Sequence, residues 1–109
     1  DTGEDSEHKS VPLSSWDISE IQRTVAAYYK VSPNDLRSRK RHHVFSHPRQ
    51  VAMYLCTQLL KISSKKIGQL FGKRSHASVL RAVKKIKKQQ QIDENLSHEL
   101  RSLTEMLSD

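Results

Sequence analysis

Apolar residues recur at intervals of three and four positions along most of this chain, the spacing that places them on one face of an α-helix. Short polar segments separate the stretches that show this interval. Only three glycines and three prolines occur in 109 residues, which is too little turn material for a β architecture. The pattern therefore predicts an all-α fold of six helices in one compact domain.

Capping residues mark where each expected helix begins, because their side chains accept hydrogen bonds from the first turn. The expected caps are Asp17 with Glu20 as a capping box, Ser32 before Pro33 and Asp35, Ser46 before Pro48, Ser63 or Ser64, and Ser75. The sixth helix is expected to begin at about Asp93. The first, third and fifth helices are expected to run to about Lys30, Lys61 and Gln90. Gly72 is expected to end the fourth helix in a left-handed conformation.

The two ends of the chain differ in character. Residues 1–13 are polar and without periodicity, which predicts a disordered linker before a domain at residues 14–109. The last expected helix carries a seam of leucines, namely Leu96, Leu100, Leu103 and Leu107. We expect this seam to pack on the domain's own core, with dimerisation or a protein partner as the alternative.

Positive charge is concentrated in the middle of the chain. Residues 36–92 contain no Asp or Glu. The fifteen cations of this span are Arg37, Arg39, Lys40, Arg41, Arg49, Lys61, Lys65, Lys66, Lys73, Arg74, Arg81, Lys84, Lys85, Lys87 and Lys88. Uncompensated charge destabilises a compact fold, so we expect a partner to supply the anions. Double-stranded DNA is favoured, and RNA, an anionic membrane surface or an ordinary solvated face are the alternatives.

The fourth and fifth expected helices, joined by a turn that contains Gly72, have the form of a helix-turn-helix. In this motif the second helix enters the major groove with its N-terminal residues against the base edges. Hydroxyl and imidazole groups can hydrogen-bond to bases, and a methyl group can pack on thymine. The N-terminal residues of the second helix are Ser75, His76, Ala77 and Ser78. Lys73 and Arg74 precede them and are expected to lie beside the phosphates. A purely capping role for Ser75 is the alternative.

The segment HPRQVAMYLCTQLLKISSKKIGQLFGKRSHASVLRAVKKI, residues 47–86, resembles the C-terminal DNA-binding domain (domain IV) of the DnaA family of bacterial chromosomal replication initiators. The upstream segment IQRTVAAYYKVSPNDLRSRKR resembles the family's first helix and basic loop, so the resemblance covers about residues 14–108. It implies a TrpR-like helix-turn-helix fold. It also implies a cytoplasmic, nucleoid-associated bacterial protein.

The resemblance further implies binding to a nine-base-pair, A·T-rich DnaA box at the replication origin. The recognition helix, about residues 76–88, would enter the major groove, and the basic loop, residues 38–45, would enter the minor groove. Carried over by position, Arg41 is the minor-groove arginine, and Arg49 and Gln50 contact phosphates. The complete set of expected DNA-binding residues is Arg41, Arg49, Gln50, Lys65, Lys73, Arg74, Ser75, His76, Ala77 and Ser78.

Two segments of the chain depart from the family pattern. Where family members usually carry an aspartate and two threonines, this chain has Ser75, Ala77 and Ser78, and Ser64-Lys65 replaces a Leu-Pro pair. A serine is a weaker acceptor for a base amine than a carboxylate, and an alanine has no hydroxyl. We therefore expect altered base discrimination, by about 1–3 kcal/mol per lost contact. Lys65 is expected to contact a phosphate instead.

Two other functions remain as alternatives: a DnaA-like regulator that binds similar boxes without initiating, and a helical protein-interaction module. An enzyme is not expected, because His42, His43 and His47 have no nearby carboxylates and Cys56 lacks zinc-ligand spacing. Cys56 is instead expected to be a small buried hydrophobe. No stretch approaches the about 18 apolar residues of a membrane span. No cofactor is expected here, since ATP and Mg²⁺ would belong to an AAA+ domain elsewhere in a longer parent protein.

Overall fold

A computed structural model describes residues 15–38, 43–60 and 62–108. The elements in chain order are α1 (Ser15–Tyr29), α2 (Pro33–Arg37), α3 (His43–Leu55), η2 (Cys56–Leu60), α4 (Ser64–Leu70), α5 (His76–Gln89) and α6 (Glu94–Ser108). All are α-helices except η2, a single π-helical turn that continues α3. The described residues contain no strand, so the predicted all-α fold of six helices is confirmed. The predicted linker at residues 1–13 lies outside the described part of the chain.

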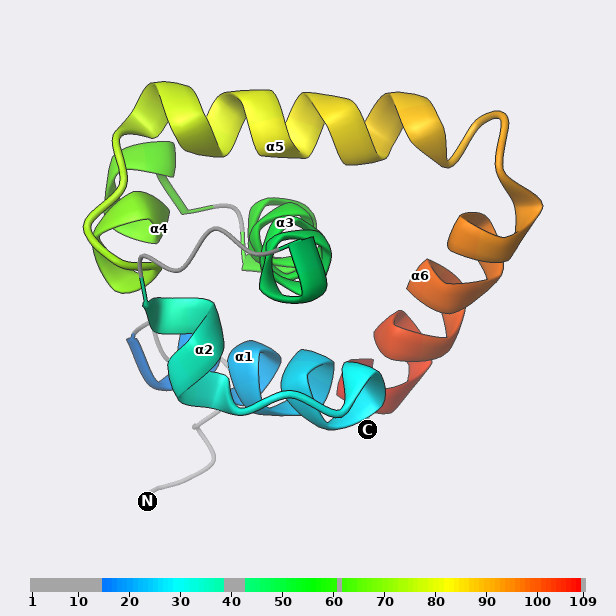
Figure 1. Cartoon of the computed structure of the whole chain (residues 1–109), viewed down its shortest axis with the longest axis horizontal. Coiled ribbons are helices and arrows are strands. Elements are labelled where there is room, and N and C mark those ends of the chain that lie inside the picture. Colours follow the sequence, from blue (N-terminus) through cyan, green and yellow to red (C-terminus); the bar gives the residue numbers. More distant parts are fainter. Residues whose placement is uncertain (1–14, 39–42, 61, 109) are drawn as a thin grey trace, which may run out of the picture.

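The helices are arranged around α3 (Figure 1). The view in the figure looks nearly along α3, with α5 on one side, α1 and α2 on the opposite side, and α4 and α6 at the two ends. Each of these elements contributes residues to one apolar core. Val51 and Leu55 of α3 and Cys56 of η2 are almost fully buried in it. The expectation of a buried Cys56 is confirmed, and burial raises the pKa of its thiol to about 12. A central helix that packs against α1, α2 and α5 explains how a chain with 35% hydrophobic residues forms a core.

Four of the expected helix starts are confirmed. The Ser32 side chain accepts from the N–H of Asn34, and Asp35 completes a capping box. The Ser63 and Ser75 side chains cap α4 and α5 in the same manner, and the Asp93 carboxylate accepts from the N–H groups of the first turn of α6. Local hydrogen bonding is therefore sufficient to define these ends.

Two expected starts are wrong. Helix α1 begins at Ser15, so Asp17 lies inside it and is not its N-cap. Helix α3 begins at His43, which leaves Ser46 in the second turn and Pro48 in the helix interior. Residues 43–45, which were expected to belong to the basic loop at residues 38–45, therefore form the start of α3. A proline inside a helix removes one backbone hydrogen bond, but packing of the additional turn outweighs this local cost, and Pro48 is buried.

The end of the third helix also differs from the expectation. A regular α-helix to about Lys61 would place Leu59 on the apolar stripe, yet its side chain is 39% exposed. The π turn η2 is wider than an α turn, so it rotates the residues that follow, burying Leu60 and turning Leu59 outward. The Thr57 hydroxyl donates to the Met53 carbonyl at 3.1 Å within this turn. No local signal in the sequence indicated the change.

The leucine seam of α6 packs on its own domain. Leu96, Leu100 and Leu103 are buried, and Leu107 packs against the core from its edge. The Tyr29 hydroxyl of α1 donates to the Glu99 carboxylate of α6 at 2.7 Å. The expected docking on the core is confirmed, since the seam is already covered within one chain.

Candidate nucleic-acid interface

A turn joins helices α4 and α5, and its backbone packs closely against Gly68 of α4. The Arg74 N–H donates to the Gly68 carbonyl at 2.8 Å, and the Gly72 φ of +85° confirms its expected left-handed conformation. A Cβ at Gly68 would lie 2.1 Å from the Arg74 carbonyl oxygen. Since no side chain fits between these backbones, α4 and the start of α5 are set at close range, as the helix-turn-helix motif requires.

The first turn of α5 presents the side chains expected to contact bases. Ser75, His76 and Ala77 are exposed, and Ser78 is half-buried. The Ser75 hydroxyl oxygen accepts from the Ser78 N–H at 3.2 Å and lies 3.2 Å from the Ser78 hydroxyl. Ser75 is therefore an N-cap, and because its hydroxyl also shares a hydrogen bond with that of Ser78, it keeps either its proton or its second lone pair for a ligand.

Helix α5 is divided lengthwise into an apolar and a cationic face. Val79, Ala82 and Ile86 are buried against the core. The exposed cations of the helix are Arg81, Lys84, Lys85, Lys87 and Lys88. Because the apolar face fixes the rotation of the helix, the cations project away from the core, on the side where a polyanion can approach.

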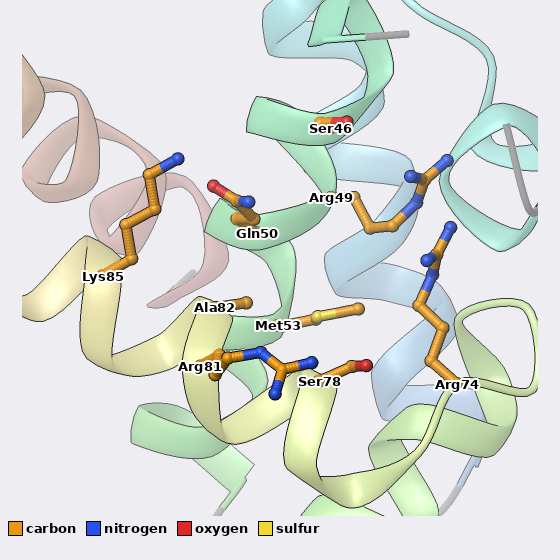
Figure 2. A pocket seen from close by; sticks show the side chains of 9 residues that line it. All are labelled: Ser46, Arg49, Gln50, Met53, Arg74, Ser78, Arg81, Ala82 and Lys85. Carbon is orange, nitrogen blue, oxygen red and sulfur yellow. The ribbon is translucent and has the colours of Figure 1, made fainter. Parts of the chain in front are cut away.

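A hollow of about 230 Å³ lies between α3 and α5 (Figure 2). Its lining residues are Ser46, Arg49, Gln50, Met53, Arg74, Ser78, Arg81, Ala82 and Lys85. Four of the expected site residues, Arg49, Gln50, Arg74 and Ser78, meet here. Ser46, Arg81 and Lys85 were not among the expected site residues. Ser46 lies four positions before Gln50, and Arg81 and Lys85 lie three and seven positions after Ser78. These intervals place side chains on the same face of a helix, so the sequence could have indicated them.

The remaining expected residues are spread over the neighbouring surface. Lys65 on α4 and Lys73 in the turn are both exposed. Arg49 differs from the others, because its side chain is only 4% exposed. Arg41, the expected minor-groove residue, lies outside the described residues. The structure thus gathers the turn, the start of α5 and the hollow on one side of α3.

Two kinds of feature were not found in the described part of the chain. Residues 15–38, 43–60 and 62–108 contain no cluster of three or more His, Cys, Asp or Glu side chains that could hold a metal ion. In the same residues, no helix combines the length and the apolar character needed to cross a bilayer.

Comparison with known proteins gives one consistent family. The family model described as bacterial dnaA protein helix-turn-helix matches residues 18–86. Over 90 residues, 83% of this chain, the sequence is 50% identical to the chromosomal replication initiator protein DnaA of Magnetococcus marinus, 43% identical to that of Burkholderia multivorans and 43% identical to that of Azoarcus sp.. The aligned region covers 20%, 17% and 19% of these proteins, so the chain spans about a fifth of their length.

The matched region contains α4, the turn, and α5 as far as Ile86, the last buried residue of its apolar face. It corresponds to a DNA-binding helix-turn-helix and not to a catalytic domain. The chain belongs to the family of bacterial DnaA C-terminal helix-turn-helix domains.

Proposed function

We propose that this domain binds DnaA-box-like sites, nine base pairs long and A·T-rich, and that it does so as the DNA-binding part of a replication initiator. The observation that carries the proposal is the first turn of α5, which is exposed, capped by Ser75, and continuous with a helix face of five cations. Such an arrangement fits the major groove, with side chains at the helix start against base edges and cations beside phosphates. The curated relatives named DnaA support the link to initiation.

Within this proposal, the site residues have three roles. Ser75, His76 and Ala77 are exposed at the helix start and are proposed to contact bases, with Ser78 behind them. The proposed phosphate contacts are Gln50, Lys65, Lys73, Arg81 and Lys85, all of which are exposed or half-buried. Arg41 is proposed as the minor-groove residue on the resemblance alone. The domain is proposed to cover residues 14–109 and to bind DNA without a cofactor.

Binding to labelled duplexes tests the proposal. We expect fluorescence anisotropy to give a higher affinity for an A·T-rich box than for a scrambled duplex. About six phosphate contacts would produce a slope of about −5 in a plot of log affinity against log salt concentration. A protein-interaction module would show no preference between the duplexes, and that result would contradict the proposal.

The role of His76 can be measured separately. His76→Ala is expected to weaken box binding by about 5- to 150-fold and to alter the preferred base at one position, as expected for a lost base contact. His98→Ala is a matched control, because His98 is also exposed but lies on α6. Equal affinities of the His76→Ala and wild-type proteins across all box variants would remove His76 from the interface.

A further inference from the structure

Leu80 of α5 is a large apolar side chain that the domain leaves in contact with solvent. Its surface is 53% exposed, whereas Val79 and Ile86 of the same helix are fully buried. Val83, close to one turn further along, is half-buried and packs against the core. Leu80 therefore lies outside the face that holds α5 to the domain.

The neighbours of Leu80 on the helix surface are residues that are proposed to contact bases. Leu80 lies four positions after His76 and three after Ala77, and these intervals place side chains next to one another on a helix. A leucine in a helix also extends toward the N-terminus, over the preceding turn. We therefore expect its isobutyl group beside the first turn of α5. Among residues 76–89, all of which the structure describes, Ala77 and Leu80 are the two exposed apolar residues.

The remaining surroundings of Leu80 are cationic. Arg81 follows it directly, Lys84 lies one turn further on, and both are exposed. From α5, the hollow of Figure 2 is lined by Ser78, Arg81, Ala82 and Lys85, and not by Leu80. A phosphate would gain nothing from an apolar side chain at this place, because phosphates are bound by cations and hydrogen-bond donors. Leu80 thus requires an apolar partner within a charged surface.

The major groove of an A·T base pair contains one apolar group, the C5 methyl of thymine. A duplex rich in A·T pairs presents these methyl groups along the floor of the groove, between the two rows of phosphates. Recognition helices contact the base edges with residues that are spaced by three and four positions. Leu80 continues the row that begins with His76 and Ala77, so it is placed to reach the groove floor while the cations meet phosphates.

We propose that Leu80 is a specificity-determining residue that packs on the C5 methyl group of a thymine in the box. This inference rests on the proposed function and names a contact within it. Together with the Ala77 methyl, the isobutyl group forms an apolar strip that favours thymine. Cytosine in the same place would present an amine and no methyl, so its donor would be left without a partner.

Replacement of single thymines by uracil tests the contact, because uracil pairs in the same way and lacks only the C5 methyl. The duplex is the box-like site that the wild-type protein binds most tightly. At one thymine we expect uracil to weaken wild-type binding about fourfold, the factor that corresponds to burial of one methyl group. The same replacement should leave the affinity of Leu80→Ala unchanged, so the two changes should be non-additive.

Leu80→Ala should itself weaken binding to the all-thymine box about four- to tenfold. The variant is expected to fold, since an exposed side chain is removed and alanine is the best helix former. Leu59→Ala is the matched control, because Leu59 is also an exposed leucine, at 39%, but lies on η2. Its affinity and its sensitivity to uracil should equal those of the wild type.

Leu80→Lys distinguishes a base-facing position from a phosphate-facing one. A lysine beside a phosphate would tighten binding to box and scrambled duplexes alike and leave the ratio of the two affinities unchanged. We expect this ratio to fall, because the contact that favours thymine is lost. An unchanged ratio, or an equal effect of uracil on the wild type and Leu80→Ala at every thymine, would overturn the proposal.

Failure of the proposed function would be recognised before the uracil series is analysed. A wild-type protein that binds box and scrambled duplex equally would overturn both proposals. A wild-type protein that prefers the box, but shows no coupling between Leu80 and any thymine methyl, would overturn only the Leu80 contact.

Discussion

Gly68 lies where helix α4 meets the backbone of the recognition turn. Its carbonyl accepts from the N–H groups of both Phe71 and Arg74, and its α-carbon faces the Arg74 carbonyl. Any side chain would enter this contact, because a Cβ would stand 2.1 Å from a backbone oxygen that cannot rotate away. The close approach of α4 to the start of α5 thus requires glycine at position 68.

Gly68→Ala is therefore expected to lower the free energy of unfolding by about 1–3 kcal/mol, the range seen when a packed contact is overfilled. Urea denaturation followed by circular dichroism measures the change. Gln69→Ala on the exposed side of the same helix is the control and should have an effect within about 0.5 kcal/mol. Wild-type stability in Gly68→Ala would show that the turn can move without cost.

At the scale of single elements, the helix starts depend on short-range hydrogen bonds. Ser32, Ser63 and Ser75 each accept a hydrogen bond from an N–H two or three residues ahead. These caps were predictable because cap and first turn are adjacent in sequence. The start of α3 and the π turn η2 were not, because packing against distant residues overrides the local preference there.

Ser75→Ala is expected to lower the free energy of unfolding by about 0.5–2 kcal/mol, since it removes the acceptor for the Ser78 N–H. Ser75→Asp retains an acceptor and adds a negative charge at a helix N-terminus, so its stability should match or exceed that of the wild type. Chemical denaturation of the three proteins gives the comparison. If Ser75→Ala were as stable as the wild type, the cap would contribute nothing measurable to α5.

At the scale of the whole molecule, α6 closes the fold through a cluster of three side chains. Tyr29 of α1 donates to Glu99 of α6, and its ring meets the His47 ring of α3 edge-on, with centroids 5.5 Å apart. Burial lowers the pKa of His47 below its ordinary 6.5, and Lys85 lowers it further, while Glu99 and Asp93 oppose the shift. The folded domain thus favours neutral His47.

This shift predicts a loss of stability in acid. As the pH falls below about 6.5, the unfolded chain takes up a proton at His47 more readily than the folded domain does, so the free energy of unfolding decreases. Urea denaturation at about pH 7.5 and about pH 5.5 should show the decrease, and His47→Gln should make it smaller. An unchanged pH dependence in His47→Gln would assign the effect to other groups.

From the amino-acid sequence alone we could predict the helical class, four helix starts, the left-handed Gly72, the buried face of α5 and the concentration of positive charge. Each of these depends on residues within a few positions of one another, so periodicity and capping chemistry were sufficient. The folded arrangement was needed to show that Arg49 donates to α2, that Arg74 donates to Ser38, and that Arg81 and Lys85 share a hollow with Gln50. These contacts join helices distant in sequence, and they form only when the core brings the helices together.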